Sequence, residues 1–406
     1  MQAAIMTEST LWRRIQSGGI GTLAVMGMTK NTGKTVALNH LLAQAAAARK
    51  ETGVTSIGRD GEDRDQVFFF PKPPVMVWPG TIVATAGATL PRSKVRYKVL
   101  GSTGIGSPMG EILVVKVLEY GAMEIAGASR SSDQCKVISR LQQCGAALVV
   151  LDGALGRSHH ASPAIADGVV LATGAALGGG IQDVIRKTRD RLAILGIAQA
   201  DEATQARCAP VFAQGGVGLW NSDGDVLFQA EIATLNAGPL LLRMVESGFD
   251  AATVAETSAL RLLSPASTPR VLPAGRGRRS TSAPGFFSAV NARSGVATIA
   301  VSGAVGRSLW RAMVSIAAHH PGLTVVVADG TKLFIDSADL AAFQKLGATL
   351  LAYRGIRIAG ITLNPFSPMG GSFAPEEFLA AARQAFSGHA VSDVMWDEKQ
   401  QSGEVQ

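Results

Sequence analysis

A short glycine-bounded segment between an apolar run and a helix-like stretch constrains the fold of this chain more than any other feature. It reads Gly27-Met28-Thr29-Lys30-Asn31-Thr32-Gly33-Lys34-Thr35, with apolar residues at 23–26 before it and the stretch 36–50 after it. In such a turn, successive backbone N–H groups can point at phosphate oxygens, and the N-terminus of the following helix adds its partial positive charge. The pattern therefore predicts a strand, a phosphate-binding turn and a helix.

The lysine and the threonine at the end of this segment carry the expected chemistry. Lys34 would reach the β- and γ-phosphates of a nucleoside triphosphate, and Thr35 would ligate Mg²⁺. The usual motif has four residues between its glycines, whereas five lie between these two, so Met28 takes the strict first-glycine position. A strand–turn–helix connection that binds no ligand is the alternative. The remaining candidate nucleotide contacts are Gly27, Thr29, Lys30, Asn31, Thr32 and Gly33.

The five-residue spacing supports a family resemblance. Gly-x5-Gly-Lys-Thr, followed by Val-Ala and a Leu-Leu helix, resembles dethiobiotin synthetase and the cobyric and cobyrinic acid amide synthetases. These belong to the SIMIBI class of P-loop NTPases, as do the ParA/MinD-like ATPases. Many ParA/MinD-like proteins carry a second lysine directly after the first glycine, where this chain has Met28, and Lys30 lies two residues later. The resemblance implies an α/β fold with a P-loop (Rossmann-like) parallel sheet, and it implies ATP and Mg²⁺ as ligands.

Asp152 is the first candidate carboxylate. It follows the continuous apolar run 146–151, which is typical of a strand that is buried on both faces and opens on a site at its carboxyl end. A P-loop enzyme holds its magnesium ion partly through an acidic residue in that position. The alternative is an aspartate that caps a helix or a turn.

Asp60 is the second candidate carboxylate. The short strand 54–58 opens into an acidic loop at 59–65. The resemblance to the SIMIBI class implies that Asp60 holds a magnesium-bound water there, with Glu62 as its nearest rival. A solvated charged turn is the alternative. The predicted magnesium site is thus Thr35, Asp60 and Asp152, and the predicted catalytic residues are Lys34, Asp60 and Asp152.

Asn364 is the candidate for recognition of the base. In dethiobiotin synthetase and its relatives, an asparagine after a late apolar strand contacts the adenine, and the segment 360–365 of this chain has that shape. Asn364 could equally cap a turn before Pro365. These residues do not distinguish ATP from GTP.

The composition allows a large cytoplasmic protein of two domains. The chain has 406 residues, 47% of them hydrophobic, and a net charge of +7 that suits anionic ligands. Its basic residues are dispersed and its aromatic residues few, which argues against nucleic-acid binding. No segment resembles a signal peptide or a membrane span. The three cysteines form no Cys-x-x-Cys pair, which predicts free thiols in a reducing compartment; they are Cys135, Cys144 and Cys208.

The chain is predicted to contain two α/β units. A P-loop nucleotide-binding domain would cover 1–263 and include a proline-punctuated, β-rich insertion at about 66–122, which is either a lid or an extension of the sheet. A basic linker rich in Pro, Ser and Gly would cover 264–296. A smaller α/β unit would cover 297–406, with strands at 297–301, 323–328 and 356–363 that each end in polar or glycine residues.

These features favour a Mg²⁺-dependent ATP-binding protein that acts as an ATPase. The segments 55–62, 80–86, 152–157 and 364–365 also resemble a bacterial P-loop family associated with reactivation of cobalamin-dependent amino acid aminomutases. That resemblance implies a protein partner, a metabolic enzyme such as an aminomutase. The alternatives are an ATP-dependent carboxylate-activating ligase similar to dethiobiotin synthetase, in which Lys30 could stabilise developing charge, and a regulatory module that binds nucleotide without catalysis.

Overall fold

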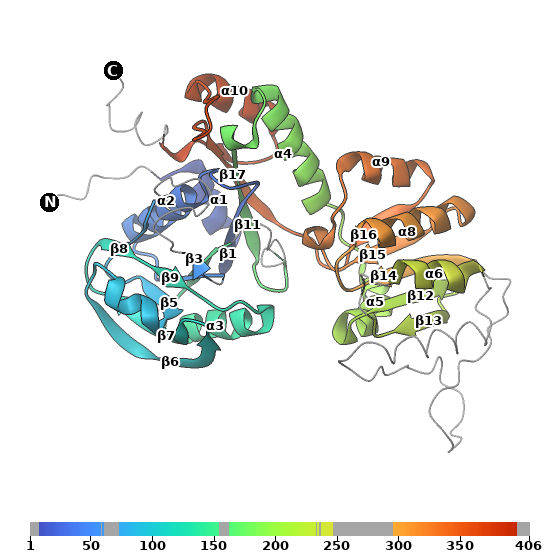
Figure 1. Cartoon of the computed structure of the whole chain (residues 1–406), viewed down its shortest axis with the longest axis horizontal. Coiled ribbons are helices and arrows are strands. Elements are labelled where there is room, and N and C mark those ends of the chain that lie inside the picture. The colour runs from blue at the N-terminus through green and yellow to red at the C-terminus, as the bar shows by residue number, and fades with distance from the viewer. Residues whose placement is uncertain are drawn as a thin grey trace, which may run out of the picture. The chain divides into compact units, whose positions relative to one another are not determined.

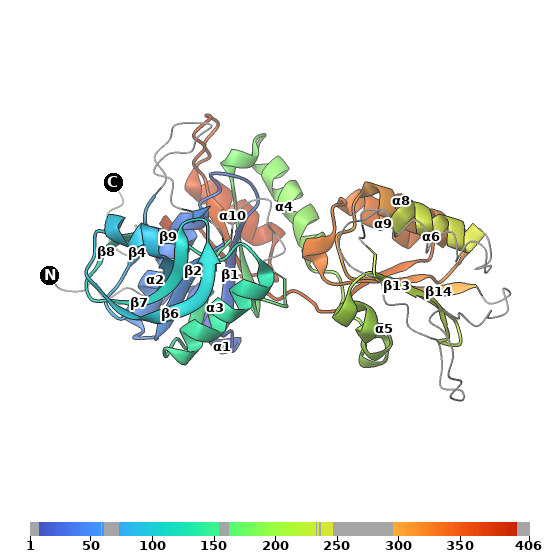
Figure 2. The same ribbon diagram turned by 60° about the horizontal axis from the view of Figure 1, so that its bottom comes forward.

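The computed structural model describes two compact units of mixed α/β architecture. The described residues are 8–57, 73–153, 162–232, 234, 237–246 and 295–395, with the backbone alone at 59–60. The first unit comprises Met1–Arg189 and Ile356–Gln406, and the second comprises Asp190–Gly355. Figures 1 and 2 show the elements of each unit in two views.

A large, mostly parallel sheet forms the centre of the first unit. Among the described residues it has nine strands, in the order β18-β17-β11-β1-β10-β2-β5-β7-β6. All neighbouring pairs from β18 to β5 are parallel, whereas β7 is antiparallel to β5 and to β6. The strands are β1 (Thr22–Gly27), β2 (Thr52–Ser56), β5 (Ile82–Ala86), β6 (Tyr97–Ser107), β7 (Gly110–Val117), β10 (Leu148–Asp152), β11 (Gly168–Gly174), β17 (Ile358–Asn364) and β18 (Val391–Ser392).

Helices cover both faces of this sheet, because side chains along each strand alternate between the two faces. Val25, Val54 and Val150 pack in one cluster with leucines of α1 and α2. Val149 and Leu151, the sequence neighbours of Val150, pack in another cluster with α3. The continuous apolar runs of the central strands follow from this double burial. The helices of the unit are α1 (Thr10–Ser17), α2 (Lys34–Ala47), α3 (Ser131–Gln143), α4 (Ile181–Leu195, which runs on into the second unit) and α10 (Pro375–Ala385).

The described part of the β-rich insertion extends the sheet. β5, β7 and β6 continue it beyond β2, so sheet extension is the alternative that the structure supports for 82–117. Two small antiparallel pairs flank them, and residues 61–72 lie outside the described part. The pairs are β3 (Arg59–Asp60) with β9 (Ile125–Ala126), and β4 (Val75–Val77) with β8 (Gly121–Met123).

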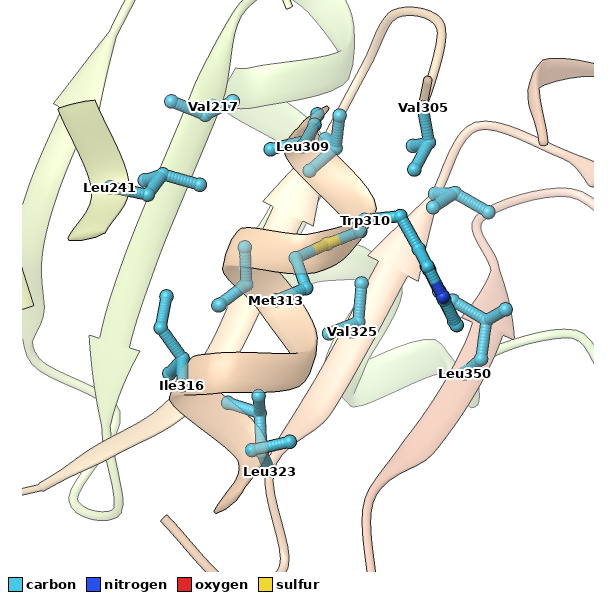
Figure 3. Packing of buried hydrophobic residues seen from close by; sticks show 14 of the residues in the cluster. Val217, Leu241, Val305, Leu309, Trp310, Met313, Ile316, Leu323, Val325 and Leu350 are labelled. Carbon is cyan, nitrogen blue, oxygen red and sulfur yellow. The ribbon is translucent and has the colours of Figure 1, made fainter. Parts of the chain in front are cut away.

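A smaller mixed sheet forms the second unit, with the order β13-β12-β14-β15-β16 among the described residues. The last three strands are parallel, and β12 is antiparallel to both of its neighbours. Figure 3 shows the core, in which Leu309, Met313 and Ile316 of α8 lie among buried side chains of the sheet and of α6. The elements are α5 (Glu202–Gln214), β12 (Val217–Asn221), β13 (Val226–Ala230), α6 (Ala237–Glu246), β14 (Val296–Val301), α8 (Arg307–His319), β15 (Thr324–Val327), α9 (Ser337–Lys345) and β16 (Thr349–Ala352).

The division into units differs from the predicted boundaries 1–263, 264–296 and 297–406. The prediction that 356–363 forms a third strand of the second unit is wrong, because β17 pairs with β11 of the first sheet. The chain leaves the first unit within α4 and returns to it at Ile356. Of the predicted linker, residues 264–294 lie outside the described part.

Two further sequence predictions concern the chain as a whole. All three cysteines are free thiols, as predicted, and burial raises the pKa of the Cys208 thiol to about 11. Within the described ranges, no helix has the length and apolar character needed to cross a membrane.

A fragment covering 181–355 is expected to fold by itself, because it contains all of α4 and the second sheet with its own core. A fragment covering 1–263 is expected to fold poorly, because it lacks β17 and β18 and leaves the edge of β11 unpaired. Thermal unfolding followed by circular dichroism checks both fragments. A sharp cooperative transition of the first sheet in the 1–263 fragment would contradict the contribution of β17 to that sheet's stability.

Candidate functional site

The Gly27–Thr35 segment, called here the glycine turn, joins the end of β1 to the start of α2, as predicted. Its backbone is fixed by the N–H of Met28, which donates to the carbonyl of Ala172 in β11 at 2.9 Å. Within the turn, the Thr32 hydroxyl donates to the Thr29 carbonyl at 2.9 Å. The turn is therefore held both to the sheet and to itself directly before the helix begins.

Both glycines of the turn are required by its geometry. A Cβ atom on Gly27 would lie only 2.9 Å from Oγ1 of Thr32 and 3.1 Å from the carbonyl oxygen of Thr29. Gly33 is the residue before α2 and has a left-handed backbone with φ of +83°, which favours glycine. Glycine is needed at position 27 because a side chain would not fit there. It is favoured at position 33 because the backbone is left-handed.

Lys34 and Asp152 form an ion pair at the carboxyl edge of the sheet. Nζ of Lys34 lies 2.8 Å from Oδ1 of Asp152 and also donates to the carbonyl of Gly153. The Asp152 side chain is 1% exposed and that of Lys34 is 14% exposed. Because β10 lies beside β1, the two predicted residues meet although 118 positions separate them in the sequence. A carboxylate buried this deeply needs a cation, and Lys34 supplies it.

Ser56 lies beside Asp152 and was missed by the sequence reasoning. The two are paired in register at the ends of β2 and β10, and residues paired in a parallel ladder point to the same face. That face carries α2, because Val54 and Val150, two positions earlier, pack against that helix. Ser56 is fully buried, and its hydroxyl forms no hydrogen bond with any residue that the structure describes. The alternation along the strand was the signal that could have identified it.

Asn364 lies against the other side of the glycine turn. Its Nδ2 donates to the Asn31 carbonyl at 2.7 Å, and its Oδ1 accepts from the N–H of Phe366 at 3.2 Å. A Cβ on Gly33 would be 3.0 Å from that of Asn364. The second bond matches the predicted alternative, in which Asn364 caps a turn before Pro365. The side chain thus joins the end of β17 to the turn through two backbone groups.

The other predicted residues are only partly described. Thr35 and Thr32 are buried, whereas Lys30 and Asn31 are exposed. Asp60 ends β3, where its backbone pairs with Ile125, but its side chain lies outside the described part, as does all of Glu62. The structure therefore brings Lys34, Asp152 and Asn364 to the turn and leaves the role of Asp60 as a prediction. No group of three or more His, Cys, Asp or Glu side chains with metal-site geometry occurs in the described ranges.

The site lies where the strand order reverses. From β1 the chain passes over β10 to reach β2, and from β10 it passes back over β1 to reach β11. Loops diverge at such a position, and ligands of open α/β sheets bind in the resulting crevice. Here the described residues at this edge of the sheet provide a lysine, a helix N-terminus, a buried carboxylate and buried hydroxyl groups, which can together hold an anion and a hard cation.

Comparisons with models of protein families, with curated proteins and with solved structures found no match.

Replacing Ser56 by Ala is expected to leave the free energy of unfolding unchanged or to raise it by up to about 1 kcal/mol, because no described residue forms a hydrogen bond with the buried hydroxyl. The matched variant Thr85→Val removes a buried hydroxyl that accepts from Ala126 N–H at 2.9 Å. It is expected to lower the free energy of unfolding by about 1–3 kcal/mol. Denaturant titrations of both variants provide the test, and equal destabilisation would show that Ser56 is hydrogen-bonded in solution.

Proposed function

We propose that the first unit binds ATP in a Mg²⁺-dependent manner and hydrolyses it. The observation that carries this proposal is the position of Lys34, at the end of the glycine turn and at the start of α2, with its ammonium 2.8 Å from the buried Asp152 carboxylate. A protein that binds a nucleoside triphosphate with Mg²⁺ uses a lysine and a helix N-terminus to hold the phosphates and a carboxylate to hold the metal ion. These three groups must lie close together. The resemblance of the turn to the SIMIBI class supports the same function.

Each residue then has a defined role. The backbone N–H groups of the turn and of the first turn of α2 hold the phosphates, and Lys34 reaches the β- and γ-phosphates. The Thr35 hydroxyl and the Asp152 carboxylate are oxygen donors and fit Mg²⁺, with Asp60 proposed as a further carboxylate. Bound Mg²⁺ would neutralise phosphate charge during hydrolysis.

The ion pair couples nucleotide binding to metal binding. When Lys34 turns to the phosphates, the buried Asp152 carboxylate gives up its ion pair with Lys34, which is costly. A divalent cation beside Asp152 removes that cost. ATP and Mg²⁺ should therefore bind together far better than either binds alone.

Asp152→Asn is expected to reduce ATP hydrolysis about 10- to 100-fold and to weaken ATP binding much less, because it disturbs the magnesium position and leaves the phosphate contacts in place. Phosphate release measured against Mg²⁺ concentration, together with calorimetric titration of ATP, checks both parts. Turnover at the level of the original protein, with unchanged Mg²⁺ dependence, would remove Asp152 from the metal site.

Lys34→Ala is expected to abolish ATP binding and also to cost about 3–5 kcal/mol of stability, because it removes one partner of a buried ion pair and keeps the other partner, Asp152, buried. The double variant Lys34→Ala/Asp152→Asn avoids the buried charge and is the better test. We expect this variant to fold and to bind no ATP, whereas Asp152→Asn alone still binds it. Lys50→Ala, which changes an exposed lysine just after α2, serves as the control. ATP affinity of the double variant equal to that of Asp152→Asn would place the nucleotide elsewhere.

The three candidate functions differ in what ATP hydrolysis requires, so assays with and without added metabolites distinguish them. Turnover of ATP without any added metabolite supports an ATPase that serves a protein partner, such as the cofactor-dependent enzyme suggested by the aminomutase-associated family. Turnover only in the presence of a small carboxylic acid supports the ligase alternative. Binding without turnover in either condition supports the regulatory module.

A further inference from the structure

The loop that follows β17 begins at Asn364, which contacts the glycine turn, and it exposes two large apolar side chains. Phe366 is 60% exposed and Met369 is 70% exposed. The loop is nevertheless well fixed, because Phe373 N–H donates to the Pro365 carbonyl at 2.9 Å and Gly370 N–H donates to the Ser367 carbonyl at 3.1 Å. The Phe366 side chain is thus exposed on a fixed backbone and is accessible to a bound molecule.

The side-chain amide of Asn364 connects this loop to the glycine turn through hydrogen bonds. One end of its amide donates to the Asn31 carbonyl, and the other end accepts the N–H of Phe366. Each end of the side chain that was predicted to contact the base is therefore held by one backbone group, and one N–H and one lone pair of the amide remain. The apolar contact with the flat face of a base has to come from another group.

The two sides of the glycine turn define the direction of a bound nucleotide. Lys34 contacts Asp152 and Gly153 at the end of β10, whereas Asn364 approaches from β17, and β1 and β11 lie between these strands. A nucleotide whose terminal phosphates lie at Lys34 and Asp152 runs along the turn away from β10. Its nucleoside part would then be directed toward β17 and the loop that β17 leads into.

We propose that Phe366 stacks on the purine base of the nucleotide whose phosphates lie on the glycine turn, an inference that rests on the proposed function. An aromatic ring offers a rigid apolar face to a base, and stacking tolerates any purine because every base has a π face. Phe366 has no hydrogen-bonding group in its side chain. The contribution of this residue to affinity is therefore the same for ATP and GTP.

Calorimetric titration of the full chain with Mg²⁺–ATP, Mg²⁺–GTP and Mg²⁺–tripolyphosphate tests this proposal, because tripolyphosphate keeps the phosphate contacts and lacks the base. Phe366→Ala should weaken ATP and GTP alike by about 10- to 100-fold and leave tripolyphosphate affinity unchanged. Phe366→Tyr should restore ATP affinity. Phe334→Ala, at an equally exposed phenylalanine of the second unit (59% exposed), and Met369→Ala in the same loop are controls that should change ATP affinity less than about fivefold.

Three outcomes would overturn the proposal, and each has a different meaning. Unchanged ATP affinity in Phe366→Ala would show that the ring makes no contact with the base. An equal loss for ATP and tripolyphosphate would show that Phe366 supports the shape of the turn instead. If the original protein binds none of the three ligands, the proposed function fails and this inference fails with it.

Discussion

The buried ion pair between Lys34 and Asp152 is the interaction on which the geometry of the site depends. A carboxylate that is 1% exposed has lost its hydration and is tolerated only beside a cation. The ion pair therefore holds the first residue of α2 close to the end of β10, and this restricts the conformations that the glycine turn can adopt. Two local features allow this conformation of the turn. Gly27 has no Cβ to clash with Thr32, and Gly33 adopts a left-handed backbone.

Much of this arrangement could be predicted from local patterns. The run before Gly27 and the run before Asp152 are both continuous and apolar, as strands buried on two faces must be. The carboxyl ends of parallel strands meet at one edge of a sheet, so a lysine after one strand and an aspartate at the end of another were expected to lie near each other. Their direct pairing follows from the adjacency of β1 and β10, which depends on the order of the strands and not on their patterns.

Local patterns could not predict that β17 joins the first sheet or that Asn364 contacts the glycine turn. β17 is apolar and buried, and such a run has the same periodicity whether it joins the first sheet or the second. Nothing local in Asn364-Pro365 distinguishes a contact with a base from a bond to the Asn31 carbonyl. Alternation along β2 could have placed Ser56 on the face that carries α2, but its position beside Asp152 is a matter of register between strands that are far apart in the sequence.

The insertion of the second unit between β11 and β17 is compatible with a stable site because the ends of that unit are held together. Ala200 N–H donates to the Ala352 carbonyl, Ala352 N–H donates to the Ala198 carbonyl, both at 2.8 Å, and Gly355 N–H donates to Oε1 of Gln199 at 3.0 Å. Once the second unit has folded, the first unit therefore closes a short connection and not a long flexible loop, which lowers the entropic cost of pairing β17 with β11. Folding of the second unit thus favours the contact between Asn364 and the glycine turn, whose atoms all belong to the first unit.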